Sequence, residues 1–148
     1  MEKILISACL IGDKCKYDGK SNYTPLIEEL LKHYELVPFC PEVEGGLETP
    51  RNPSERIGNQ VRMGNGRSVT HQFYKGADLA VNICLYLGIK VAILKETSPS
   101  CGVHEIYDGT FSHKKIKGQG VTAETLTKKG IRVISENEIE EFLNEEKK

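Results

Sequence analysis

The chain has 148 residues, with 20 Lys and Arg against 21 Asp and Glu, which gives a formal net charge of −1. A chain of this length normally forms one domain, and 39% hydrophobic residues exclude disorder as the default. The balanced charge argues against a dedicated partner of polymeric nucleic acid, because such proteins usually carry a basic excess. No apolar stretch approaches the roughly 20 residues of a membrane-spanning helix.

Five cysteines are the unusual feature of the composition. An odd number cannot pair completely, and the chain is too long for a disulfide-stapled mini-domain. The sequence Ile6-Ser7-Ala8-Cys9 resembles a lipoprotein cleavage site, but only eight residues precede Cys9, against about 15–30 in a signal peptide. We therefore expect a cytoplasmic protein, in which cysteines bind metal or react more often than they form disulfides.

The first elements alternate between strand and helix. The apolar run 3–8 predicts a buried strand, and Thr24-Pro25 predicts the start of a helix. A second strand is predicted at 35–39. Pro38 places that strand at an edge or near its end, because proline cannot donate a backbone hydrogen bond.

The segment 41–66 interrupts this alternation. It is rich in proline and glycine, carries Arg51 and Arg56, and has little hydrophobic periodicity. Irregular segments longer than about 12–15 residues are uncommon inside compact domains and are often functional. We therefore predict a lid-like loop over an active site.

The second half returns to the alternating pattern. Apolar residues recur at helical spacing from Val69 to Leu87, so we predict a long helix capped by Ser68 and ended by Gly88. A third strand is predicted at 91–94. Asp108-Gly109 then predicts a two-residue hairpin turn.

The chain closes with a further helix, strand and helix. Thr122 is expected to cap the first helix, and a strand follows at 132–134. Asn137 is expected to begin the last helix with Glu140 in a capping box, before a charged tail at 144–148. This alternation predicts a single α/β domain with a mostly parallel sheet.

Three cysteines follow three predicted strands. Cys9 and Cys40 come directly after the first and second strands, and Cys101 lies a few residues beyond the third. The carboxyl ends of parallel strands share one edge, where α/β proteins bind ligands, so the three thiols are expected to converge. The alternative is that small buried cysteines simply pack there.

Three thiolates fit two kinds of metal site. With His104 as a fourth ligand, through Cys101-x2-His104, they would hold zinc. Without it, they would hold three irons of a 4Fe–4S cluster and leave one iron open. Spacing alone does not separate the two. Cys15 is either an auxiliary thiol or a loop residue, whereas Cys84 lies in the helical stripe and is assigned to the core.

Six short motifs also lie in order along nearly the whole chain. They are Ser7-Ala8-Cys9-Leu10, Tyr17-Asp18-Gly19, Cys40-Pro41-Glu42-Val43 with Gly45-Gly46-Leu47, Pro50-Arg51, Ser98-Pro99-Ser100-Cys101-Gly102, and Gly118-Gln119-Gly120-Val121-Thr122. Each motif alone is weak evidence. Together and in this order, they resemble the thiouracil desulfurase family.

This resemblance implies a Rossmann-like three-layer sandwich and a 4Fe–4S cluster held by Cys9, Cys40 and Cys101. The open iron would bind the sulfur of thiouracil or a related thiolated pyrimidine base or nucleotide. Hydrolysis would then replace C=S by C=O and release sulfide without net redox change.

Several polar residues are candidates for the chemistry. Glu42 lies two residues from a cysteine and is the best-placed base, although it would otherwise be read as a solvated loop carboxylate. Ser98 and Ser100 could donate hydrogen bonds or transfer a proton. Asp18 is a weaker acid–base candidate.

An anion on the substrate has two candidate sites. Gly118 and Gly120 precede Thr122 at a predicted helix start, where backbone N–H groups can bind an anion or merely be capped. The other candidates are Arg51 and Arg56; Arg51 could instead anchor the lid through a carboxylate such as Glu55.

Two other functions remain open on this reading. A zinc-stabilised nucleotide-binding module would use His104 and the Gly118–Thr122 turn. A metal-free redox or persulfide carrier would need Cys15 close to Cys9.

Overall fold

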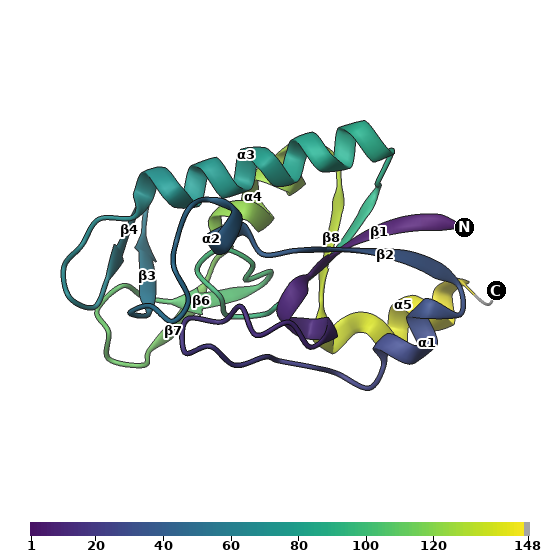
Figure 1. Ribbon diagram of the computed structural model, residues 1–148, viewed down its shortest axis with the longest axis horizontal. Coiled ribbons are helices and arrows are strands. Elements are labelled where there is room, and N and C mark those ends of the chain that lie inside the picture. Colours follow the sequence, from purple (N-terminus) through teal and green to yellow (C-terminus); the bar gives the residue numbers. More distant parts are fainter. Residues whose placement is uncertain (147–148) are drawn as a thin grey trace.

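A computed structural model describes residues 1–146 of the chain, and within them the strands of the central sheet run in the order β2-β1-β5-β8, all parallel (Figure 1). The sheet consists of β1 (Glu2–Ser7), β2 (Tyr34–Phe39), β5 (Val91–Leu94) and β8 (Arg132–Ser135). The predicted α/β fold with a mostly parallel sheet is confirmed.

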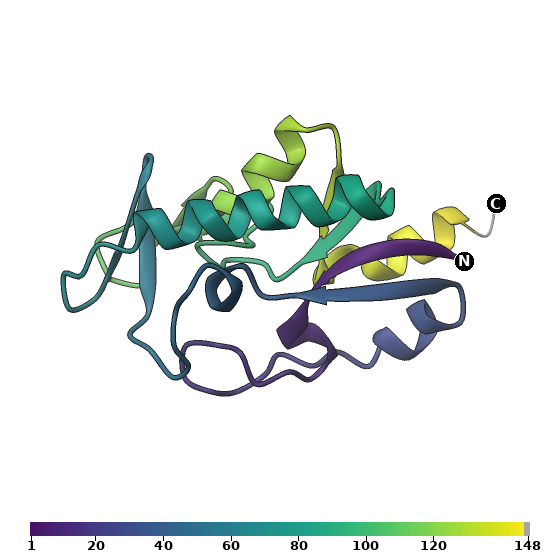
Figure 2. The ribbon, with the colours of Figure 1, turned by 45° about the horizontal axis from the view of Figure 1, so that its top comes forward.

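Helices cover both faces of this sheet (Figure 2). α3 (Thr70–Leu87) and α4 (Val121–Lys128) pack on the face that carries Leu5. α1 (Ile27–Leu31) and α5 (Ile139–Glu146) pack on the face that carries Ile4 and Ile6. Because both faces are covered, β1 reads as a continuous apolar run rather than an alternating one. β2 is an edge strand, as Pro38 predicts.

The long helix forms as its periodicity predicts. Gly88 ends α3 with a left-handed φ of 70°, but Ser68 does not cap the helix: Val69 is the N-cap and has no side-chain bond there. Gly76 faces the carbonyl of Pro41, and a Cβ at this position would overlap that backbone. This close approach lets α2 (Pro41–Glu44) lie directly against α3.

The segment 41–66 is not irregular throughout, although its lack of hydrophobic periodicity suggested that it would be. The segment contains α2 and an antiparallel hairpin of β3 (Ser54–Ile57) and β4 (Gln60–Met63). The inward positions of β3 are Ser54 and Arg56, both buried, so the strand carries no apolar alternation that a sequence pattern could reveal.

A second hairpin, of β6 (Glu105–Tyr107) and β7 (Lys115–Lys117), has a longer connection than Asp108-Gly109 predicts. The strands are joined by 108–114. Asp108 Oδ1 accepts hydrogen bonds from the N–H and hydroxyl of Thr110, which bends the chain there without closing a two-residue turn.

The helix caps near the C-terminus also differ from expectation. Gly120, not Thr122, is the N-cap of α4. The capping box is formed by Ser135 and Glu138, because a 3-10 turn, η2 (Glu136–Glu138), precedes α5. α5 includes 144–146 of the predicted charged tail, and 147–148 lie outside the described residues. No helix within 1–146 is long and apolar enough to cross a membrane.

Candidate metal and active site

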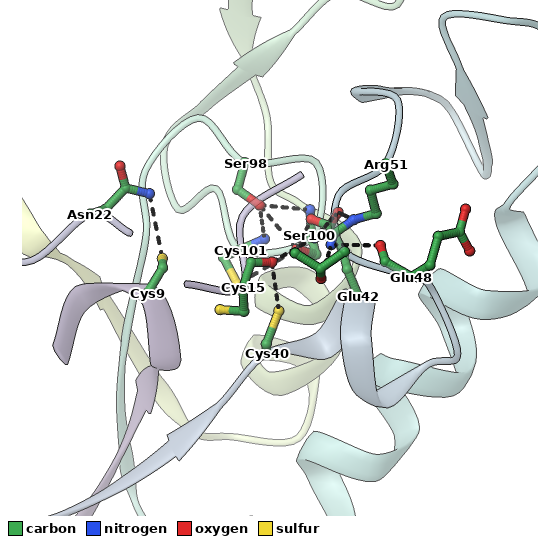
Figure 3. Close-up of polar contacts among 11 residues, drawn as sticks. Cys9, Cys15, Asn22, Cys40, Glu42, Glu48, Arg51, Ser98, Ser100 and Cys101 are labelled. Atoms are coloured by element: carbon green, nitrogen blue, oxygen red, sulfur yellow. Dashed lines mark hydrogen bonds and ion pairs between the residues drawn. The ribbon is translucent and has the colours of Figure 1, made fainter. Parts of the chain in front are cut away.

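A cavity of about 550 Å³ opens beside the carboxyl ends of β1, β2 and β5. Cys9, Cys40 and Cys101 line it, as the strand-end argument predicts, and Cys15 joins them (Figure 3). Cys84 lies between α3 and the sheet in the apolar core, as expected.

Each of these thiols has its own structural support. Cys9 lies on η1 (Ala8–Ile11), directly after β1, and the amide of Asn22 donates a 3.5 Å hydrogen bond to its sulfur. Cys40 is the N-cap of α2. Cys101 lies in the loop after β5 and is fully enclosed.

The thiol of Cys15 contacts the sulfurs of both Cys9 and Cys40. Its hydrogen bond lowers the pKa of Cys9 to about 7 and also lowers the pKa of Cys40. The same contacts raise the pKa of Cys15 itself. Burial raises the pKa of Cys101 to about 12. Because thiolates are the metal-binding form of cysteine, the lowered pKa values of Cys9 and Cys40 favour these two thiols as ligands over Cys15.

The chemistry of this lining fits an iron–sulfur cluster. Cys9, Cys40 and Cys101 line one cavity of about 550 Å³ and offer the soft sulfur donors that such clusters use. The thiolates of a 4Fe–4S cluster bind different irons, whereas zinc needs all its ligands about 2.0–2.3 Å from one point.

The predicted zinc ligand His104 does not join the cysteines. Its Nε2 lies 2.6 Å from Glu138 Oε1, and its side chain is 60% exposed. The zinc site through Cys101-x2-His104 is therefore not formed in this structure.

Glu42 is the centre of a polar network beside Cys101 (Figure 3). Its Oε2 accepts a 2.9 Å hydrogen bond from the hydroxyl of Ser100. The Ser100 oxygen lies 3.0 Å from that of Ser98 and 3.6 Å from the sulfur of Cys101. Asp18 lies elsewhere, on an exposed turn where it accepts from the Lys20 N–H.

Arg51 holds the other oxygen of Glu42. Its Nε and Nη2 each lie 3.1 Å from Oε1 of that carboxylate, and the guanidinium is almost fully buried. The remaining N–H groups donate to the carbonyls of Cys15 and Glu48 and to the hydroxyl of Thr49. All five donors of the guanidinium are thus engaged. The lid-anchoring partner suggested by the sequence, Glu55, was the wrong carboxylate.

The start of α4 supports the Cys101 loop. The N–H groups of Gly120, Val121 and Thr122 donate to the carbonyls of Gly102, Pro99 and Ser100. Gly118, Gly120 and Thr122 do not line the cavity, and the N–H groups expected to face an anion are bonded to this loop instead. A Cβ on Gly120 would lie 2.4–2.7 Å from the backbone of Ser100 and Cys101.

Glu96 and Lys95 also line the cavity, and the sequence did not indicate either of them. Glu96 Oε1 accepts hydrogen bonds from the backbone N–H groups of four residues: Thr97, Val103, His104 and Glu105. Burial raises the pKa of Glu96, but these bonds outweigh it and hold the pKa below its usual value. Lys95 pairs with Glu136 at 3.0 Å, and its charge contributes to the lowered pKa of Cys9. No local motif marks either residue.

Comparisons with known proteins agree with this geometry. The family model described as 2-thiouracil desulfurase matches residues 4–138. The uncharacterized protein YbbK of Bacillus subtilis (strain 168) is 41% identical over 150 residues, covering 95% of this chain and 99% of YbbK. The solved structure of the [4Fe-4S]-dependent thiouracil desulfidase TudS is 45% identical, with a TM-score of 0.91 and 95% of each chain covered.

Proposed function

Because the chain belongs to the 2-thiouracil desulfurase family, we propose that it is a 4Fe–4S-dependent desulfurase. Its substrate is thiouracil or a related thiolated pyrimidine base or nucleotide, in which C=S becomes C=O. The observation that carries this proposal is one cavity lined both by the strand-end cysteines Cys9, Cys40 and Cys101 and by the pair Glu42 and Ser100.

The three strand-end thiols are the proposed ligands, one for each of three irons. When bound, the cluster supplies an open Lewis-acidic iron, which suits the soft sulfur of a thiocarbonyl. Water supplies the incoming oxygen and sulfide leaves, so no electron acceptor is needed.

The protein's own part is to hold and move protons. Glu42 takes a proton from the attacking water, and Arg51 fixes the carboxylate so that Oε2 faces Ser100. Ser100 lies between Glu42 and Ser98, so it can pass a proton along this chain of oxygens. We assign Arg51 to positioning rather than to substrate binding, because its donors are already engaged. Asp18 has no step in this mechanism.

The test is metal and sulfide analysis of anaerobically reconstituted protein. Wild-type protein should be brown, contain iron and release sulfide from 2-thiouracil. Cys101→Ser should lose most of the iron, whereas Cys84→Ala, at the core cysteine outside the cavity, should keep it. Colourless wild-type protein without iron, or unchanged iron in Cys101→Ser, would refute the proposal. Stoichiometric zinc in place of iron would favour the zinc-stabilised nucleotide-binding module.

A further inference from the structure

The connection between β6 and β7 supplies an aromatic wall to the same cavity. Tyr107, Phe111 and His113 line it together with the cysteines. The rings of Tyr107 and His113 meet edge to face, with their centroids 6.4 Å apart. Neither this wall nor its residues has a part in the proposed proton transfers.

Two of these residues adopt an unfavourable backbone conformation. Phe111 has a φ of 58° and His113 a φ of 63°, in the left-handed region that non-glycine residues rarely occupy. Such strain persists only where the surrounding structure imposes it, and it is concentrated at binding and catalytic sites.

The neighbouring β3–β4 hairpin holds the backbone that leads to Phe111 in this conformation. Glu55 on β3 accepts hydrogen bonds from the N–H groups of Gly109, at 2.9 Å, and Phe111, at 3.1 Å. At the base of the connection, the N–H of Asp108 donates to the carbonyl of Lys114 at 2.9 Å. The backbone on the N-terminal side of the Phe111 ring is therefore fixed before any ligand arrives.

The ring of Phe111 lies beside Gly64, which follows β4. A Cβ placed on Gly64 would lie 3.6 Å from its Cε1, an ordinary van der Waals distance. Phe111 nevertheless remains 37% exposed. A fixed, partly exposed aromatic ring in a cavity of about 550 Å³ suits the face of a planar heterocycle.

We propose that Phe111 stacks on the pyrimidine ring of the substrate and determines the enzyme's preference for planar heterocyclic thiocarbonyls. This inference rests on the proposed function, because it places the heterocycle between the 108–114 connection and the cysteines. Stacking exists before and during the reaction alike, so it lowers KM and leaves kcat unchanged.

The experiment measures uracil affinity and 2-thiouracil kinetics in the cluster-loaded protein. Phe111→Ala should raise both the dissociation constant of uracil and the KM for 2-thiouracil by about 5- to 150-fold. Iron content and kcat should stay at the wild-type level. Phe111→Tyr, which keeps an aromatic face, should restore both constants.

A second variant separates the ring from the backbone. Phe111→Gly removes the ring but accepts the left-handed φ without strain, so it should fold at least as well as the wild type and bind as weakly as Phe111→Ala. Tyr86→Ala is the matched control, because Tyr86 is an aromatic residue on α3 that is 89% exposed and does not line the cavity.

Different results would refute the stacking role of Phe111 and the proposed desulfurase function. Wild-type protein that holds no iron and releases no sulfide refutes the proposed function. An active wild type, with uracil affinity and KM unchanged in both Phe111→Ala and Phe111→Gly, overturns the stacking role alone. Failure of the active wild type to bind uracil also overturns it.

Discussion

Arg51 shows how one buried side chain can organise the lining of a cavity. Its guanidinium joins Glu42 on α2 to the carbonyl of Cys15, so it links this carboxylate to the loop that carries the fourth thiol. The side chains of Arg51 and Glu42 are 2% and 13% exposed. Removing one member of such a pair leaves the other charge poorly solvated.

Arg51→Ala should therefore lower the free energy of unfolding by about 3–5 kcal/mol. Urea denaturation of the cluster-free protein measures this. Arg67→Ala is the control, because Arg67 pairs with Glu48 on the surface, where an ion pair contributes about 0–1 kcal/mol. An equal loss of unfolding free energy in the two variants would show that burial does not determine how much Arg51 contributes to stability.

Glu42→Gln should keep the iron content and lower kcat by about 100- to 10,000-fold, because a general base is lost while the thiols are untouched. Sulfide release at saturating 2-thiouracil measures the effect. Glu44→Gln, on the same short helix but exposed and outside the cavity lining, should behave as the wild type. Comparable activity in Glu42→Gln would remove Glu42 from the mechanism.

The sequence located the acid–base candidates better than their partners. Glu42, Ser98 and Ser100 lie in motifs near cysteines, and the structure brings them into one network. Glu96 could not be found in this way. Its Oε1 accepts hydrogen bonds from backbone N–H groups of the loop that folds around it. Because every residue except proline has such a group, residue types do not identify these donors.

At the level of elements, the loop that carries Cys101 is held from two directions. Glu96 bonds its N–H groups from the end of β5, and the first turn of α4 bonds its carbonyls. The helix N-terminus is suited to this because its first N–H groups have no partners within the helix. The predicted anion site and the observed loop anchor thus use the same donors.

Gly120→Ala should disturb this anchor, because its Cβ would overlap the backbone of Ser100 and Cys101. We expect a lower Tm and reduced iron content after reconstitution. Gly118→Ala is the matched control two residues away, where a Cβ would meet only the side chain of Ile106, at 3.4 Å. If both variants bound iron equally, close packing at Gly120 would not be needed for the site.

The helices and strands that could be predicted from the sequence are those in which apolar residues recur at the buried positions. The strands of the central sheet and α3 were found because their buried positions are apolar. In the hairpin of 41–66, β3 was missed because Arg56 occupies an inward position. There it is satisfied by the carbonyls of Gly58 and Gln119 and by Glu124. Gln119 and Glu124 lie more than 60 residues further along the chain, so the sequence does not reveal them as partners of Arg56.

Across the whole molecule, the pair His104–Glu138 connects the Cys101 region to the turn before α5. The hydrogen bond to Glu138 raises the pKa of His104 above its ordinary value. The folded protein therefore holds this proton more tightly than the unfolded chain. The resulting stabilisation is fully present below the unfolded pKa of about 6.5 and is lost as the pH rises through the higher folded pKa.

His104→Ala should accordingly reduce the free energy of unfolding more at about pH 5.5 than at about pH 8.5. The difference should stay below about 1 kcal/mol, because the histidine is largely exposed. Urea denaturation at the two pH values measures it. In a Glu138→Gln background the same substitution should lose its pH dependence, and a retained dependence would assign the effect to another group.

The spread of the site along the chain also determines when the site can exist. Cys9 lies directly after the first strand of the fold, and the loop of Cys101 is held by α4, whose residues follow it in the sequence. During synthesis, the early cysteines therefore leave the ribosome long before the elements that enclose them, and the domain folds as a unit only afterwards. The cysteines can therefore bind a cluster together only after the whole domain has been synthesised and has folded. A truncated chain that lacks α4 would contain the thiols but would not form the site.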